Sequence, residues 1–99
     1  MICSLLNVKR SQIHGRGCFA GVDLSPGIMI PITNTLVEKE TDWTITDGEQ
    51  VYDLFAPFRF LNHSDNANAE VVWIDDIMYL HIMELTKVGH ELTINYEPD

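Results

Sequence analysis

The chain contains the stretch Arg59-Phe60-Leu61-Asn62-His63-Ser64-Asp65-Asn66-Ala67-Asn68, in which an apolar approach runs into a cluster of polar residues. Asparagine, aspartate and serine side chains bond nearby backbone groups and therefore favour tight turns. Phe55 and Phe58 precede the stretch and extend its apolar approach. We expect a polar turn fixed behind a hydrophobic run, an arrangement that holds hydrogen-bond donors and acceptors in place.

Two further segments, one near each end of the chain, place glycine beside polar residues. They read His14-Gly15-Arg16-Gly17-Cys18-Phe19-Ala20 and Gly89-His90-Glu91-Leu92-Thr93-Ile94-Asn95-Tyr96. Glycine permits positive φ and lets a ligand approach the backbone closely. A single Gly-x-Gly also fits an ordinary hairpin loop, so it defines no site on its own.

The three segments together resemble the motifs of the SET domain family, the fold of most protein-lysine methyltransferases. Residues 14–20 resemble its Gly-x-Gly motif followed by Phe-Ala, residues 59–68 its Arg-Phe-x-Asn-His-Ser…Asn motif, and residues 89–96 its closing Gly-Glu-Glu-Leu-Thr-x-x-Tyr motif. Their order and spacing agree over nearly the whole chain. Asp42-Trp43 and Tyr52-Asp53-Leu54-Phe55 are also similar to the minimal virus-encoded SET proteins.

The resemblance implies a mainly β, β-clip-like fold of several small sheets, in which the closing segment passes the Asn-His-Ser turn in a pseudoknot. It implies one minimal SET domain over residues 1–99, with no pre-SET or post-SET region. The length of 99 residues also fits a single domain.

Segments rich in apolar and β-branched residues predict short strands at residues 4–9, 28–37, 69–74, 77–85 and 91–95. Pro31 indicates an edge strand or a bulge, and Asp75-Asp76 indicates a tight hairpin. His81 lies in an apolar run, where we expect a hydrogen-bonded structural residue. One short helix is expected after Asp47-Gly48-Glu49-Gln50, which fits a capping box.

The charge balance restricts the choice of partner. Six basic residues against fifteen acidic ones give a net charge of −9. Nucleic-acid-binding proteins carry a basic surface, so this composition argues against one. A basic partner fits better, although the charge also serves solubility alone.

The sequence predicts an intracellular protein, in the cytoplasm or the interior of a host cell, and in the nucleus if the host is eukaryotic. No apolar run approaches the roughly 20 residues of a membrane helix, and the first residues lack signal-peptide features. Cys3 and Cys18 have no CxxC spacing, and we expect each to be a reduced, partly buried apolar residue.

The resemblance implies S-adenosyl-L-methionine as cofactor on one face, a substrate peptide on the other, and a narrow lysine channel between them. Gly15, Arg16 and Gly17 then offer backbone groups to the methionine end of the cofactor, where a side chain at a glycine would hold the ligand off. Asn62 and His63 contact the adenine edge through backbone groups.

Arg59 and Phe60 complete the implied cofactor site. Arg59 either reaches the cofactor carboxylate or forms a structural ion pair. The implied contacts give His63 no role as a general base. No second His or Cys stands at ligand spacing from it, so we expect no metal.

By resemblance, Tyr96 is the catalytic tyrosine, which lines the channel and touches the cofactor. Tyr52 is a second channel candidate. Because a carboxylate would raise the pKa of the substrate amine, we expect the channel to be free of acidic residues, and residues 92–96 contain none.

Several positions depart from the family pattern. Asp65 stands where many members have Cys, Ala67 where Pro is usual, His90 where Glu is common, and Ile94 where many members have an aromatic residue. The number of methyl groups added is left open. Larger members close the lysine channel with a C-terminal tail, so we expect a second subunit or the substrate to complete this site.

The sequence therefore predicts a protein-lysine N-methyltransferase that uses S-adenosyl-L-methionine and acts on a basic protein, either histone-like or ribosomal. A catalytically silent SET-like module that binds a basic partner is the alternative. An unrelated acidic β protein that mimics a nucleic acid explains the charge but not the three motifs.

Overall fold

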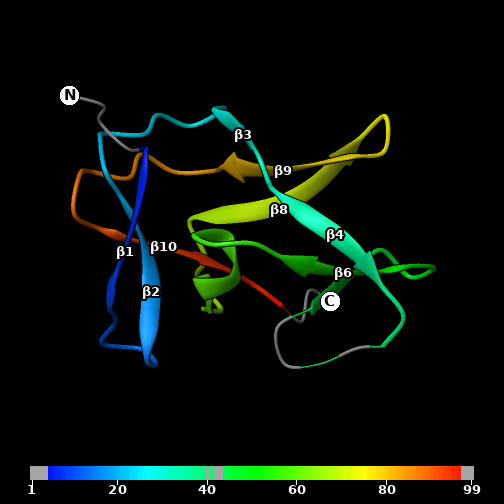
Figure 1. Cartoon of the computed structure of the whole chain (residues 1–99). Helices are drawn as coiled ribbons and strands as arrows, with labels where there is room; N and C mark the ends of the chain where they lie inside the picture. The colour runs from blue at the N-terminus through cyan, green and yellow to red at the C-terminus, as the bar shows by residue number, and fades with distance from the viewer. Residues whose placement is uncertain (1–4, 40, 42–43, 97–99) are drawn as a thin grey trace.

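The computed structural model describes residues 5–39, 41 and 44–96, in which short strands predominate and form three small sheets (Figure 1). This confirms the mainly β fold of several small sheets. Among these residues, no helix has the length and apolarity that crossing a membrane requires. Cys3 and the Asp42-Trp43 pair lie outside the described residues.

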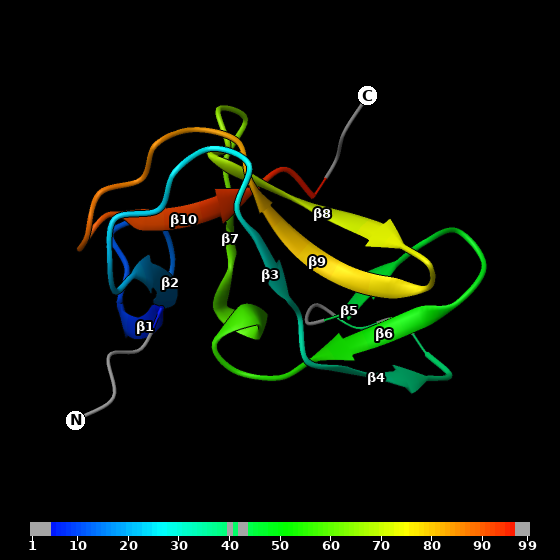
Figure 2. The same cartoon turned by 90° about the horizontal axis from the view of Figure 1, so that it is seen from above.

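The first sheet brings all three sequence motifs together. Its strands lie in the order β1-β2-β10-β7, with bounds Leu6–Arg10, Arg16–Ala20, Glu91–Ile94 and Asn62–His63. β10 pairs antiparallel with β2 and parallel with β7, so it lies between them (Figure 2). This is the passage of the closing segment beside the Asn-His-Ser turn that the resemblance implies.

The side chain of Asn68 fixes β10 in this position. Its Nδ2 donates to the carbonyl oxygen of Glu91 at 2.9 Å, and its Oδ1 accepts from the N–H of Thr93 at 2.9 Å. An asparagine amide satisfies one donor and one acceptor at once. The last residue of the central motif therefore bonds the backbone of β10 as a neighbouring strand would.

The second sheet is a hairpin extended by one edge strand. Its order is β3-β9-β8, with bounds Met29–Pro31, Ile77–Ile82 and Ala69–Ile74. Asp75 and Asp76 have φ of 51° and 66°, the positive values that a type I′ turn requires at both positions. Pro31 closes the edge strand, which confirms the expectation drawn from its missing N–H.

The third sheet replaces the predicted helix. Its order is β4-β6-β5, with bounds Asn34–Val37, Val51–Leu54 and Thr44–Thr46. Asp47 Oδ1 accepts from the N–H groups of Glu49 and Gln50 at 2.9 and 2.8 Å, and Gly48 has φ of +99°. The helix prediction is wrong because these residues use the same side-chain bonds to close the β5–β6 hairpin.

The hydrophobic run before the central motif is partly buried. Phe58–Phe60 form a 3-10 turn (η1) that leads into β7. Phe58 and Leu61 are 5% and 3% exposed. The side chain of Phe55, at the start of the run, is exposed.

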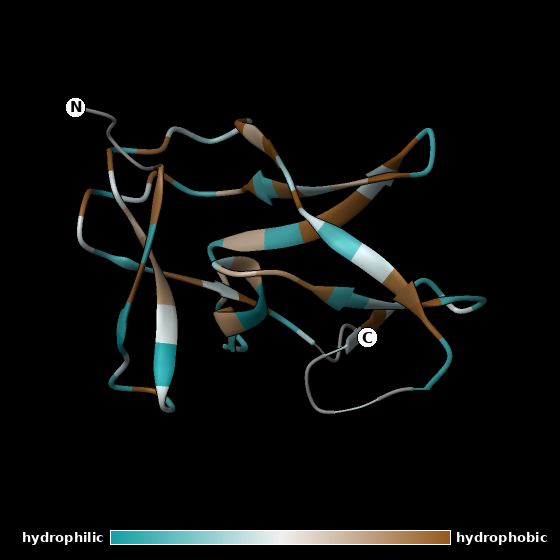
Figure 3. Cartoon of the chain, viewed as in Figure 1, coloured by the Kyte–Doolittle hydropathy of each residue, from teal (hydrophilic) through white to brown (hydrophobic). Residues whose placement is uncertain are grey.

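One hydrophobic cluster draws residues from all three sheets, and the apolar segments that supply it are visible in Figure 3. Leu92 comes from the first sheet, Leu80 from the second and Leu54 from the third. Cys18 is fully buried within the cluster. Burial, reinforced by the charge of Glu91, raises the pKa of its thiol to about 12, so Cys18 behaves as the apolar residue predicted.

Replacement of Leu92 tests whether β10 anchors the core. Leu92 is fully buried, so Leu92→Ala should lower the free energy of unfolding by about 2–5 kcal/mol. Leu36→Ala is the matched control, because Leu36 is 55% exposed and its loss should cost within about 0.5 kcal/mol. Urea denaturation measures both variants, and equal losses would contradict this placement of the core.

Candidate active site

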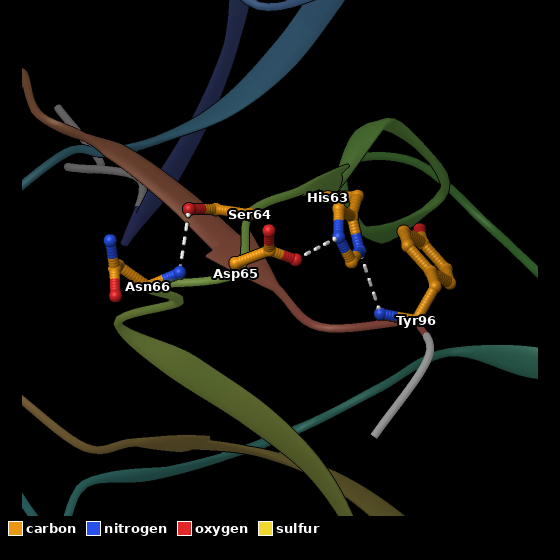
Figure 4. Close-up of polar contacts among 5 residues, drawn as sticks. All are labelled: His63, Ser64, Asp65, Asn66 and Tyr96. Carbon is orange, nitrogen blue, oxygen red and sulfur yellow. Dashed lines mark hydrogen bonds and ion pairs between the residues drawn. The ribbon is translucent and has the colours of Figure 1, made fainter. Parts of the chain in front are cut away.

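The turn of the central motif and the end of the closing motif meet at Tyr96. The Tyr96 hydroxyl donates to the carbonyl oxygen of Leu61 at 2.6 Å, and its backbone N–H donates to His63 Nδ1 at 3.1 Å. The rings of Tyr96 and His63 lie 6.4 Å apart at an interplanar angle of 29° (Figure 4). The structure therefore brings residues 62, 63 and 96 together.

A cavity of about 410 Å³ opens beside this contact, and we call it the basic cavity. Its described lining consists of two arginines, two histidines and neighbouring residues, namely His14, Gly15, Arg16, Arg59, Phe60, Leu61, Asn62, His63 and Tyr96. No carboxylate belongs to this described lining. Of the residues predicted to hold the cofactor, only Gly17 is missing from it.

A second hollow of about 430 Å³, which we call the groove, lies between β5 and β8. Its described lining is Thr41, Thr44, Ile45, Thr46, Ala67, Ala69, Glu70, Val71, Trp73, Met83, Ile94, Asn95 and Tyr96. Tyr96 is the one described residue that lines both the groove and the basic cavity. The side chain of Tyr96 thus borders two hollows with different linings.

The phenol of Tyr96 is a neutral group at physiological pH. Burial raises its pKa to about 12, because the surrounding atoms disfavour the phenolate. A neutral phenol retains the proton that it donates to the carbonyl oxygen of Leu61. Tyr96 can therefore orient a neighbour or donate a hydrogen bond, but it is not a base near neutral pH.

Tyr52 lies outside this arrangement. Its hydroxyl is 3.3 Å from Asp47 Oδ2 and 3.1 Å from Gln50 Oε1, over its own hairpin turn. It belongs to neither described lining, but its ring centroid is 6.3 Å from that of Trp73 and its cross-strand partner is Ile45, and both of these residues line the groove. Tyr52 therefore stands beside the groove, with its hydroxyl bonded within the β5–β6 hairpin.

Gly17 has a structural role that the sequence did not predict. A Cβ atom at this buried position would lie 2.3 Å from Glu91 Oε2, so the missing side chain makes room for that carboxylate. The carboxylate accepts from Ser11 Oγ at 2.7 Å and from Asn62 Nδ2 at 2.8 Å. Gly17 therefore permits a close approach of the Glu91 carboxylate, and its backbone contact with a cofactor stays a prediction.

Glu91 is the functional residue that sequence reasoning missed. The Asn62 Nδ2 that it holds also lies 3.1 Å from the carbonyl oxygens of His14 and Arg16. Asn62 and Glu91 thus tie β7 to the loop that borders the basic cavity. Glu91 belongs to the closing motif, two residues after Gly89, so the sequence did mark it. Its contact with Gly17 could be predicted only if the pairing of the strands were known.

The groove carries one carboxylate in its described lining. Glu70 lines it, and its Oε2 lies 2.8 Å from His81 Nδ1 across the β8–β9 pair. This contact confirms His81 as a hydrogen-bonded structural residue. The acidic side chain lies on the groove side of Tyr96, while the described lining of the basic cavity has none.

The sequence matches the SET domain model over residues 15–97. The chain therefore belongs to the SET domain family. A comparison with proteins of curated function found no match.

Solved structures share this fold. A Plasmodium falciparum protein described as a candidate histone methyltransferase gives a TM-score of 0.73 at 18% identity, over 99% of this chain and 97% of that one. The methyltransferase domain of human PR domain-containing protein 2 gives 0.68 at 15% identity, over 96% of this chain and 78% of that one. A chain of ctPRC2 in complex with H3K27me3 and H3K27M gives 0.80 at 18% identity, over 98% of this chain and 15% of that one.

A double-mutant cycle tests the contact between Gly17 and Glu91. Gly17→Ala forces the carboxylate to move and should cost about 1–3 kcal/mol of unfolding free energy. The same substitution in a Glu91→Ala protein should cost less by at least about 0.5 kcal/mol, because the clashing oxygen is gone. Strict additivity of the two changes in urea denaturation would contradict the contact.

Proposed function

We propose that this protein is a protein-lysine N-methyltransferase that uses S-adenosyl-L-methionine. The observation that carries the proposal is the position of Tyr96, which borders both the basic cavity and the groove. A methyl donor on one side and a lysine on the other would meet at this residue. Membership of the SET domain family supports the same assignment.

The residues of the basic cavity fit the cofactor. Arg16 and Arg59 are cations that suit the carboxylate at the methionine end, and Phe60 offers apolar surface. In this proposal, backbone groups of Asn62 and His63, which line the cavity, contact the adenine edge. When bound, S-adenosyl-L-methionine supplies an electrophilic methyl group. In this proposal Gly15 gives the loop its left-handed backbone, at φ of +47°, and Gly17 supports the site through Glu91.

The groove suits an extended basic segment. It lies between β5 and β8, which are edge strands of their sheets in the described part of the chain. Edge strands offer backbone groups to an added strand. Glu70 in the groove and the net charge of −9 favour a lysine-rich substrate, either histone-like or ribosomal.

The chemistry requires a neutral amine held in line with the methyl group. A free lysine has a pKa near 10.4, so its neutral form costs roughly 4 kcal/mol at pH 7.4. Tyr96 cannot remove the proton near neutral pH, because its own pKa is about 12. In this proposal it orients the amine, while desolvation in the passage between groove and cavity favours the neutral form.

Two finer features belong to the same proposal. Similarity to the minimal virus-encoded SET proteins suggests a protein of that type, which acts inside a host cell. A homodimer in which the second subunit closes the lysine channel would complete the active site.

Substitution of Tyr96 tests the reaction. Labelled methyl transfer onto a cell lysate should fall by on the order of 10²-fold in Tyr96→Phe, because the hydroxyl that bonds the Leu61 carbonyl is lost. Tyr79→Phe is the matched control, because Tyr79 lies on β9 and lines neither hollow in the described structure. Equal labelling by wild type and Tyr96→Phe would remove Tyr96 from this role.

Calorimetry with S-adenosyl-L-methionine separates an enzyme from a silent binding module. We expect heat of binding in the wild-type protein and in Tyr96→Phe, whereas Arg59→Ala should bind more weakly. No heat at high micromolar cofactor would favour the catalytically silent module that binds a basic partner.

A dilution series tests the homodimer. Light scattering and methyl transfer, followed in parallel, should show specific activity falling as the dimer dissociates. A monomer that keeps full activity on an ordinary lysine-rich peptide would contradict the shared site.

A further inference from the structure

We propose that the His63 side chain, held by Asp65, positions Tyr96 and releases it on acidification. The effect of this contact on catalysis rests on the proposed methyltransferase activity. The positioning of Tyr96 by His63 does not depend on that activity. The family resemblance gives His63 only backbone contacts to a cofactor, which leaves the ring available for this second role. The three side chains and their contacts are drawn in Figure 4.

The hydrogen bonds define the tautomer of His63. The backbone N–H of Tyr96 can only donate, and it points at His63 Nδ1 at 3.1 Å. Nδ1 must therefore be the unprotonated nitrogen of a neutral ring, and Nε2 must carry the hydrogen. Nε2 lies 2.9 Å from Asp65 Oδ1, which accepts that hydrogen.

The turn holds Asp65 in place for this contact. The N–H of Ser64 donates to the carbonyl oxygen of Ile94 at 3.1 Å, and the N–H of Asn66 donates to Ser64 Oγ at 3.1 Å. Asp65 is one of the positions where this chain departs from the common family pattern. The carboxylate–imidazole pair is therefore a property of this protein that the motif does not imply.

Protonation of His63 conflicts with the bond to Tyr96. An imidazolium carries hydrogens on both nitrogens, so Nδ1 would then face the Tyr96 N–H with a second donor. Tyr96 keeps its hydroxyl bond to Leu61 but loses the bond that fixes its backbone. Tyr96 is then held only by its hydroxyl bond to Leu61. Its ring becomes more mobile between the basic cavity and the groove.

The charged and titratable neighbours of His63 come from several elements. Asp65 and Tyr96 contact the ring, and His14, Arg16 and Arg59 line the same basic cavity. The Asp65 and His63 side chains are 92% and 40% exposed, so solvent screens their interaction. We therefore expect effects of a few fold from Asp65 rather than an all-or-none switch.

Nuclear magnetic resonance of the full chain tests the structural part. Proton–nitrogen correlation spectra of the wild-type protein should show His63 with its hydrogen on Nε2 at neutral pH. The backbone amide signal of Tyr96 should then shift on acidification with the same midpoint as the His63 ring. A hydrogen on Nδ1, or a Tyr96 amide that ignores the titration of His63, would overturn the proposal.

Two substitutions separate the hydrogen bond from the charge. Asp65→Asn keeps an acceptor oxygen and should retain the Nε2–H tautomer, whereas Asp65→Ala should lower the preference for that tautomer by up to about fivefold. Both variants lack the carboxylate of Asp65, so the comparison between them separates the acceptor oxygen from the negative charge. An unchanged tautomer ratio in Asp65→Ala would remove Asp65 from the proposal.

Activity then tests the functional consequence. Methyl transfer at neutral pH should fall by a few fold in Asp65→Ala and by less in Asp65→Asn, because only the asparagine keeps an acceptor for the His63 ring. Equal methyl transfer by the two variants would overturn the link to catalysis. If the protein transfers no methyl group, the proposed function fails, and the resonance spectra still decide the positioning role.

Discussion

The parallel pairing of β7 with β10 is the constraint on which the site depends. Thr93 lies opposite Asn62 and Ile94 opposite His63, although the two strands are far apart in the sequence. A two-residue strand offers few backbone bonds, so the pairing needs other support. The Asn68 amide supplies it from one side, and the buried Leu92 anchors β10 in the core.

The basic cavity and the groove, which both border Tyr96, differ in the charge of their linings. The described lining of the basic cavity carries arginine and histidine without a carboxylate, whereas the groove carries Glu70. This distribution suits a cofactor with a carboxylate on one side and a lysine-rich segment on the other. Tyr96 at the border stays neutral, so in the proposed reaction it contributes orientation rather than proton transfer.

The sequence predicted the meeting of the three motifs better than the local structure around them. The three motifs do meet in one sheet, and local turn chemistry located the Asp75-Asp76 hairpin. The helix after Asp47 failed because one Asp-Gly pattern serves both a capping box and a hairpin turn, and only pairing with distant strands decides between them. The contacts of Tyr52 with its hairpin and of Gly17 with Glu91 could not be predicted for the same reason, since they depend on sheet register.

Mapping of two ligands on one set of backbone amide signals tests the central claim most directly. S-adenosyl-L-methionine should shift the signals of the loop at Gly15 and Arg16, and a lysine-rich peptide should shift those of β5 and β8. Tyr96 should respond to both ligands, because it alone of the described lining residues borders both hollows. If both ligands shift one and the same set of signals, or if Tyr96 responds to neither, this account of the site is contradicted.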